Sequence, residues 1–221
     1  MIEVTAIAKN YKKRQVLRNI SFQVQSGECV AIVGRNGCGK STLLQIMAGI
    51  LKADAGEIWY YGQKACGKAY RRFCGYVPQG NPLIEELSVN DNLKLWGAVK
   101  AGRMSEVVER FQLDEILKMP VCRLSGGMKR RLAIACACFN WPPILLLDEP
   151  TTALDLYYKE SIHEFLEHYR ALDGMIIMTT HDEAEIRNAD RCMVMTEGRL
   201  KELSGEERSI KEIYQYIKAD C

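Results

Sequence analysis

The chain has 221 residues, of which 30 are Lys or Arg and 28 are Asp or Glu, so its formal net charge is +2. This length suits one domain or one domain with a subdomain, and so small a charge gives no electrostatic reason to expect nucleic acid as a partner. Nine cysteines without a C-x-x-C pair indicate neither a disulfide framework nor a zinc site, and a reducing cytosol fits best.

The chain opens with two strand patterns. Apolar and polar residues alternate from Ile2 to Ala6 and again from Ile20 to Val24. A period of two predicts two antiparallel strands, each with one buried face.

The next segment is a glycine-rich loop, Gly34-Arg35-Asn36-Gly37-Cys38-Gly39-Lys40-Ser41, between the apolar run 29–33 and the helix-like stretch 42–48. Its form, G-x-x-x-x-G-K-[ST], is that of a phosphate-binding loop, in which glycines let backbone N–H groups face an anion. Lys40 is expected to reach the β- and γ-phosphates, and the Ser41 hydroxyl to ligate Mg²⁺. Nucleotide binding is therefore the leading hypothesis.

Cys38 lies inside this loop, between two glycines and close to Lys40. A nearby cation and a helix N-terminus both favour thiolate, so we expect a reactive thiol that bound ATP protects. The alternative is an inert thiol that fills space in the core.

Helical signals replace the strand patterns between Pro78 and Trp141, and Ser88 to Asp91 has the form of a helix start. We expect this region to be an insertion in a core that resumes afterwards. The runs 144–147 and 175–178 are short and continuously apolar, as strands covered on both faces are. An amphipathic helix is predicted from Asp155 onward, and the order strand, helix, strand predicts a parallel α/β core.

Further motifs distinguish between the families of nucleotide-binding proteins. Leu124-Ser125-Gly126-Gly127-Met128, with Gln79 before it and the run 144–149 after it, resembles the nucleotide-binding subunit of ATP-binding cassette (ABC) transporters over essentially the whole chain. The resemblance implies an α/β fold: a P-loop (RecA-like) parallel-sheet core with an N-terminal antiparallel β part and an inserted helical subdomain. As one domain, 1–221, it divides into a core of 1–79 and 141–221 and a helical subdomain of about 80–140.

The same resemblance implies roles for single residues. Asp148 resembles the carboxylate that organises Mg²⁺ with Ser41 and Gln79, and Glu149 resembles the general base that activates water. His181 resembles the histidine that contacts the γ-phosphate, and Gln79 also counts among the catalytic residues. The implied ATP-binding residues are Tyr11, Gly34, Arg35, Asn36, Gly37, Cys38, Gly39, Lys40, Ser41, Thr42, Ser125, Gly126, Gly127 and Asp155.

Some of these assignments leave alternatives open. Tyr11 sits where the family places an aromatic ring that stacks on adenine, but it could be a plain turn residue. Asp155 matches a loop that communicates across the ATP-bound dimer, and it could equally be a helix N-cap, or both. His163 and His168 are interpreted as packing or surface residues.

The resemblance implies an ATPase that forms a homodimer or heterodimer around two Mg·ATP, with Ser125 to Gly127 of one subunit holding the γ-phosphate bound by the other. We expect it on the cytoplasmic face of the membrane, powering a separate transmembrane permease, since no apolar stretch approaches the roughly 18–20 residues that cross a bilayer. Leu83 and Ile84, within 81–87, are expected to be exposed and to contact that permease, or else to cover the helical subdomain.

Met128 departs from the family's commonest signature, which ends in Gln. The run Gly-Gly-Met-Lys-Arg-Arg-Leu, residues 126–132, resembles exporters of drugs, lipids or polysaccharides whose ATPase is a separate chain. Export is therefore favoured. The alternatives are a non-transport relative acting on DNA or ribosomes, which the short interval from Ser41 to Leu124 disfavours, and a regulatory ATPase bound to a membrane protein.

Overall fold

The structure is a computed structural model, and it describes residues 1–12, 14–96, 103–203 and 209–219. Its strands are β1 (Ile2–Tyr11), β2 (Arg14–Val24), β3 (Cys29–Val33), β4 (Ala55–Tyr60), β5 (Gln63–Lys64), β6 (Cys74–Val77), β7 (Ile144–Asp148), β8 (Met175–Thr179), β9 (Arg191–Thr196) and β10 (Arg199–Leu203). Its helices are α1 (Lys40–Met47), α2 (Lys68–Phe73), α3 (Val89–Trp96), α4 (Arg103–Arg110), α5 (Gly126–Cys138), α6 (Leu156–Ala171), α7 (Glu183–Asn188) and α8 (Ile210–Ala219), with short 3-10 turns at Asp114–Ile116 and Val121–Arg123.

The strands form two sheets. One has six strands in the order β10-β9-β3-β8-β7-β6, and all its neighbouring pairs are parallel except β10 with β9. The other has four strands in the order β2-β1-β4-β5, paired antiparallel. The predicted class, an α/β fold with a parallel core and an N-terminal antiparallel part, is confirmed.

The parallel sheet is apolar on both faces because both are covered. Alternate residues of its central strands, among them Val30, Ile32, Leu146 and Ile177, share a core with α1 and the antiparallel sheet. Their neighbours, Ala31, Leu145, Leu147, Ile176 and Met178, pack in a second core with α5 and α6. Neither face of these strands contacts solvent, and for this reason their sequences are continuous apolar runs.

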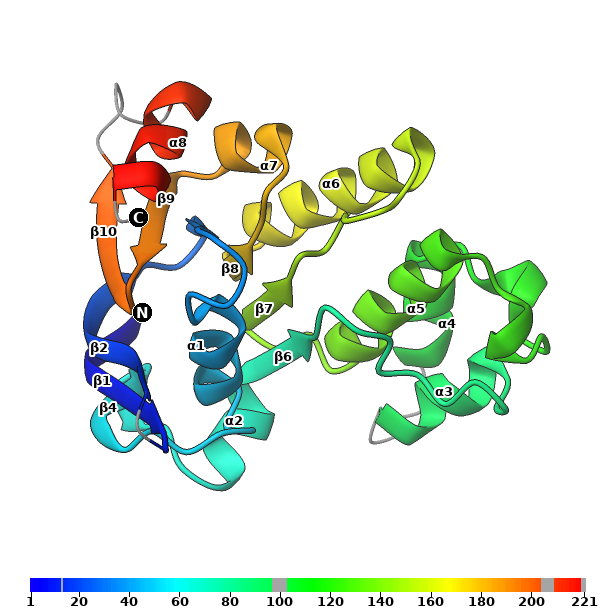
Figure 1. Cartoon of the computed structure of the whole chain (residues 1–221). Coiled ribbons are helices and arrows are strands. Elements are labelled where there is room, and N and C mark those ends of the chain that lie inside the picture. The colour runs from blue at the N-terminus through cyan, green and yellow to red at the C-terminus, as the bar shows by residue number, and fades with distance from the viewer. Residues whose placement is uncertain (13, 97–102, 204–208, 220–221) are drawn as a thin grey trace.

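The helical insertion forms the second lobe of the molecule, with α3, α4 and α5 lying beyond β6 in Figure 1. Ser88 caps α3 as expected: its Oγ accepts from the Asp91 N–H at 3.1 Å and donates to the Asp91 carboxylate at 2.6 Å. The limits given above for core and insertion stay a prediction.

Two local expectations need correction. Alternation in β1 breaks at Ala6, which has φ 52° and interrupts the register, so Ile7 is the buried residue instead of Ala6. Leu83 is not exposed: it joins the core of the helical lobe, and only Ile84, 39% exposed, remains available at the surface. Among the helices that the structure describes, none is long and apolar enough to cross a membrane.

Candidate active site

The carboxyl ends of four parallel strands bring the candidate residues to one edge of the sheet. The glycine-rich loop follows β3, Thr180 and His181 follow β8, Glu149 follows β7, and Gln79 comes two residues after β6. Because β3, β8, β7 and β6 are consecutive neighbours, segments distant in sequence meet here, where open α/β sheets bind ligands.

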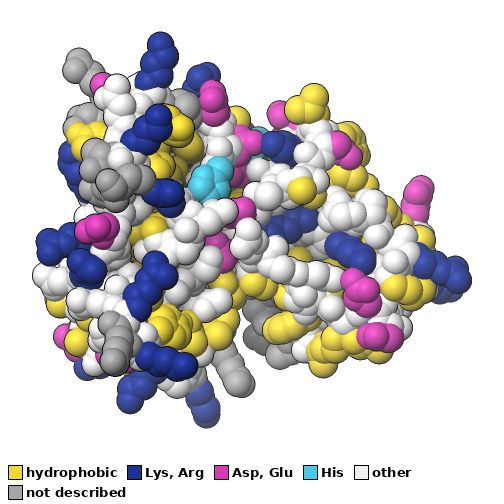
Figure 2. All heavy atoms as spheres, viewed as in Figure 1, with side chains coloured by type: hydrophobic (Ala, Val, Ile, Leu, Met, Phe, Trp, Pro, Cys, Tyr) yellow, Lys and Arg dark blue, Asp and Glu magenta, His cyan; other side chains and the backbone are white. Residues whose placement is uncertain are grey.

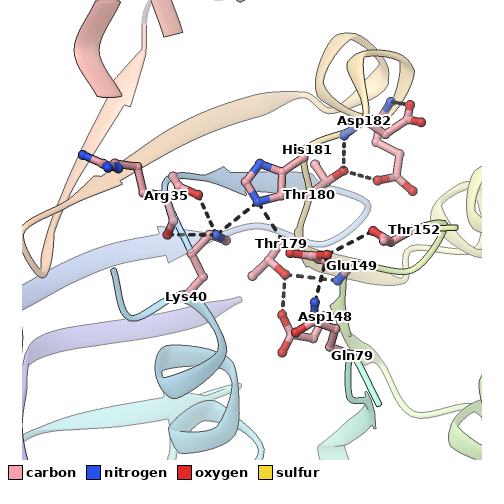
Figure 3. A network of polar contacts seen from close by, with 12 residues as sticks. Arg35, Lys40, Gln79, Asp148, Glu149, Thr152, Thr179, Thr180, His181 and Asp182 are labelled. Carbon is pink, nitrogen blue, oxygen red and sulfur yellow. Dashed lines mark hydrogen bonds and ion pairs between the residues drawn. The ribbon is translucent and has the colours of Figure 1, made fainter. Parts of the chain in front are cut away.

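The glycine-rich loop turns through left-handed backbone at Gly37 (φ 78°) and Gly39 (φ 116°), conformations that glycine adopts without steric cost. Helix α1 then begins at Lys40, whose side chain is buried and folds back over the loop. Its ammonium donates to the Gly34 carbonyl at 2.6 Å and lies 3.3 Å from that of Arg35 (Figure 3). The loop therefore holds a preplaced cation at the start of a helix.

Cys38 does not have the environment that its sequence position suggests. Burial raises the pKa of its thiol, and this outweighs the opposing attraction of Lys40 and the backbone hydrogen bonds. The side chain is partly buried against the core beneath the antiparallel sheet. The expectation of a favoured thiolate is wrong, because desolvation penalises the charged form more than the nearby cation stabilises it.

Two carboxylates lie at the carboxyl end of β7, in different environments: Asp148 is its last residue and Glu149 comes directly after it. Asp148 is buried, and its Oδ1 accepts a 2.5 Å hydrogen bond from Thr179 Oγ1 on the neighbouring strand. Glu149 has φ 50°, and its N–H donates to both the carbonyl and Oγ1 of Thr179. Its carboxylate points to the strand edge, where Oε2 accepts from Gln79 Nε2 at 3.1 Å and from Thr152 Oγ1 at 3.0 Å (Figure 3).

His181 faces this carboxylate and the loop lysine together. Its Nε2 lies 3.4 Å from Lys40 Nζ and 3.5 Å from Glu149 Oε1. Burial first, and then the charge of Lys40, lower the pKa of His181 from 6.5, against a smaller opposing effect of Glu149. The imidazole is therefore mainly neutral at pH 7, with a single ring N–H.

A cavity of about 390 Å³ lies against Lys40, Gln79 and Glu149, whereas His181 and Asp148 are not part of its lining. Its lining comes from the N-terminal sheet, the loop and the far strand ends: Tyr11, Arg14, Val16, Asn36, Gly37, Gly39, Lys40, Ser41, Thr42, Gln79 and Glu149. Acidic and histidine side chains gather where the two halves of the molecule meet in Figure 2. The volume lies in the range of small-molecule sites.

Some candidate residues lie outside this cavity. Arg35 and Cys38 line a neighbouring open cavity of about 610 Å³, together with Arg14 and Arg18. Ser125 and Gly126 are exposed at the start of α5, and Ser125 caps it by accepting from the Met128 N–H.

Gly127 and Asp155 also lie outside the cavity lining. Gly127 is buried against Tyr158, whereas Asp155 caps α6 by accepting from the Tyr158 N–H at 3.0 Å. The N-cap alternative for Asp155 is therefore confirmed.

Sequence reasoning missed several contributors. Arg14 and Val16 line the cavity from β2, and Arg14 Nη2 donates to the Gly37 carbonyl at 3.2 Å. Thr152 and Thr179 bond the two strand-end carboxylates. Thr179 was detectable as a polar residue ending an apolar strand, but no pattern in the sequence points to Arg14 or Val16.

Side chains whose oxygen atoms could bind a metal ion are present at this site. In the ranges that the structure describes, no three His, Cys, Asp or Glu side chains gather in a position to hold an ion. Mg²⁺ commonly takes one or two carboxylates and completes its shell with water and substrate phosphates. The oxygen donors of Asp148 and Ser41 fit such a site.

A parallel sheet whose central strand leads through a glycine-rich loop into a helix defines a P-loop nucleotide-binding protein. The family model described as "ABC transporter" matches residues 17–152. The chain belongs to the ABC transporter family.

Curated relatives carry two transport directions in their names. The chain is 38% identical over 209 residues to "Nod factor export ATP-binding protein I" of Sinorhizobium fredii, covering 90% of this chain and 61% of that protein. It is 34% identical over 228 residues to "Sulfate/thiosulfate import ATP-binding protein CysA" of Pseudomonas syringae pv. tomato, covering 97% of this chain and 69% of that protein.

Solved structures agree over nearly the whole chain. A dimeric post-hydrolysis state of the ATP-binding cassette MJ0796, bound to ADP and Pi, superposes with a TM-score of 0.83 at 30% identity, covering 93% of this chain and all of that one. An ATP-binding subunit of an ABC transporter gives 0.85 at 28% identity, covering 98% and 99%. The fold around the site is thus that of an ABC cassette.

Proposed function

We propose that the chain binds Mg·ATP, dimerises around two such nucleotides, and hydrolyses them to drive a separate membrane permease. The observation that carries the proposal is that Lys40, Gln79 and Glu149 line one cavity beside a phosphate-type loop, with His181 in contact with both Lys40 and Glu149. Each group is of a kind that phosphoryl transfer uses, and each comes from a different segment of the sheet edge.

Hydrolysis needs a base for the attacking water. Glu149 takes a proton from that water as the new bond to the γ-phosphorus forms; the bond to the bridging oxygen breaks, giving ADP and phosphate. Lys40 holds the phosphate charge, and the N–H of neutral His181 donates a hydrogen bond to the γ-phosphate. Gln79 and Thr152 fix the carboxylate of Glu149 beforehand.

Asp148 and Ser41, with Gln79 nearby, would hold Mg²⁺. When bound, the ion offsets negative charge that develops on the phosphate oxygens. The short bond from Thr179 keeps the buried Asp148 carboxylate oriented, so the residue enters the reaction with little reorganisation. Tyr11 lines the cavity and is 46% exposed, with Lys9 Nζ 5.7 Å from the centre of its ring, and we expect the ring to stack on adenine.

Dimerisation is proposed because Ser125 and Gly126 are exposed and lie away from the cavity of their own chain. At the start of a 13-residue helix they can hold the γ-phosphate bound by a second chain. The solved dimer of the similar cassette MJ0796 supports dimerisation.

Export is the direction we propose, on the basis of Met128 and the similarity to Nod factor export proteins. The permease, contacted through 81–87 with Ile84 at the surface, would place the chain on the cytoplasmic face of the membrane. Pull-down from native membranes, followed by identification of the captured membrane protein, tests the partner and the direction; capture of ribosomes or DNA instead would contradict both.

The test of the activity is Glu149→Gln. We expect ATP binding to persist while turnover falls by about 10²–10⁴, the usual contribution of general acid–base catalysis. Steady-state phosphate release and calorimetric ATP affinity measure the two quantities. A variant that hydrolyses ATP as fast as the parent would contradict the role of Glu149.

A further inference from the structure

Arg130, in the second turn of α5, makes an unusual set of contacts with the backbone of the active site. Its guanidinium donates to four carbonyls: Nε to Pro150 at 2.9 Å, Nη1 to Pro78 at 2.5 Å, and Nη2 to Asp148 at 2.7 Å and to Glu149 at 2.9 Å. One side chain therefore joins the helical lobe to two strand ends of the parallel sheet.

These partners are not the usual ones for arginine. A guanidinium most often pairs with a carboxylate, whereas here each hydrogen bond ends on a backbone oxygen. Burial lowers the pKa of Arg130, and the nearby charge of Asp148 opposes this. Burying this cation has a desolvation cost, which its hydrogen bonds to the carbonyl oxygens offset. These charge-assisted hydrogen bonds in turn hold the backbone that carries the carbonyls in place.

The backbone it holds is itself in a rare conformation. Glu149 has φ 50°, in the left-handed region that non-glycine residues seldom adopt. With the chain turned there, three successive carbonyls, those of Asp148, Glu149 and Pro150, all reach one guanidinium. Such conformations persist where the surroundings over-determine them, and they gather at active sites.

The fourth contact, with the Pro78 carbonyl, also fixes the backbone next to Gln79. The Pro78 carbonyl belongs to the peptide that leads into Gln79, whose amide bonds the Glu149 carboxylate. Arg130 thus holds the main chain on both sides of that side-chain hydrogen bond.

We propose that Arg130 is a positioning residue that sets Glu149 and Gln79 for hydrolysis and ties both to the helix that begins after Ser125. The inference rests on the function proposed above. Because the helix start is where a second chain's phosphate would bind, a shift of α5 is passed to Glu149 through rigid contacts. A displacement of about 1 Å at a catalytic group is enough to cost about 10²-fold in rate.

The experiment compares Arg130→Ala and Arg130→Lys with Lys129→Ala, a neighbour whose ammonium pairs with the exposed carboxylate of Glu85. For Arg130→Ala we expect kcat to fall by about 10²-fold at unchanged ATP affinity, and millimolar guanidinium, but not methylammonium, to restore part of it. Arg130→Lys should be intermediate, since one ammonium cannot span four carbonyls. Lys129→Ala should behave as the parent.

Hydrogen exchange supplies a readout that does not need activity. The amides of Glu149, Thr151 and Thr152 should exchange faster in Arg130→Ala than in the parent and in Lys129→Ala; Pro150 has no amide hydrogen. Unchanged exchange there, or a rate loss that follows ATP affinity and is not restored by guanidinium, would overturn the inference. If Arg130→Ala does not fold, Arg130→Lys decides: turnover and exchange equal to the parent's refute it.

Failure of the proposed function can be distinguished from failure of the inference about Arg130. A parent chain that binds ATP without hydrolysing it contradicts the ATPase assignment whatever the exchange data show. A parent that hydrolyses ATP, together with an equally fast Arg130→Ala variant, contradicts the positioning role alone.

Discussion

At the scale of the residue, Cys38 illustrates how burial can outweigh a nearby charge. Its thiol has a pKa raised above the ordinary value of 9.0 although Lys40 is close by. We therefore expect thiol alkylation at neutral pH to modify the exposed Cys66 and Cys122 before Cys38. Mass-spectrometric mapping over time checks the order, and modification of Cys38 first would contradict the assigned environment.

Two histidines have pKa values shifted in opposite directions. Attraction to the Glu185 carboxylate, whose Oε1 lies 3.7 Å from His163 Nε2, raises the pKa of His163 against the effect of burial, while burial and Lys40 lower that of His181. NMR titration, assigned with His163→Gln and His181→Gln, should find His163 above 6.5 and His181 below it. The reverse order would show that these environments are wrong.

The two shifts act on stability with opposite signs. The contribution of His163 is fully present below its unfolded pKa and is lost as the pH rises through its higher folded value. For His181 the unfolded chain binds more protons, so its contribution grows as the pH rises from the folded value through 6.5. Chemical unfolding of the two Gln variants across this range measures each separately.

At the scale of the element, variants of Asp155 can distinguish helix capping from a role in the dimer. Its Oδ1 satisfies the Tyr158 N–H at the start of α6. Asp155→Ala should lower the free energy of unfolding by about 0.5–2 kcal/mol, whereas Asp155→Asn keeps an acceptor and should change it little. Urea unfolding gives both values.

The same pair of variants tests the second role. If Asp155→Asn is as stable as the parent but loses ATPase activity, Asp155 also acts in communication between subunits. Equal stability loss in Asn and Ala variants would contradict the capping contribution.

At the scale of the whole molecule, the exposed start of α5 is where a second chain would bind. A side chain at Gly127 would meet the ring of Tyr158 at 2.2 Å, so a carboxylate there would disturb the fold of the monomer. Gly126 has open space around it. We expect Gly126→Asp to leave folding and monomer nucleotide binding intact and to prevent ATP-driven dimerisation, because like charges repel.

Size-exclusion chromatography in the Glu149→Gln background measures this. The matched control is Cys122→Asp, which adds the same charge at another exposed position of the helical lobe. Dimers that form normally with Gly126→Asp would rule out a cross-subunit phosphate contact at this glycine.

Much of this molecule could be predicted from its sequence, because local rules and fixed spacing carry the information. Continuous apolar runs at 29–33, 144–147 and 175–178 identify strands buried on both faces, and the glycines of 34–39 identify the loop that follows the first of them. The order of these elements gave the fold class, and the motifs gave the family.

Tertiary structure alone decided what depends on contacts between distant segments. The alternation at Ala6 fails because a bulge shifts the register, Leu83 is buried because the helical lobe closes over it, and Cys38 is desolvated because the loop packs on the core. The four carbonyls around Arg130 come from 78 and 148–150, which only folding brings together. Such effects arise from burial and long-range geometry, which no local pattern records.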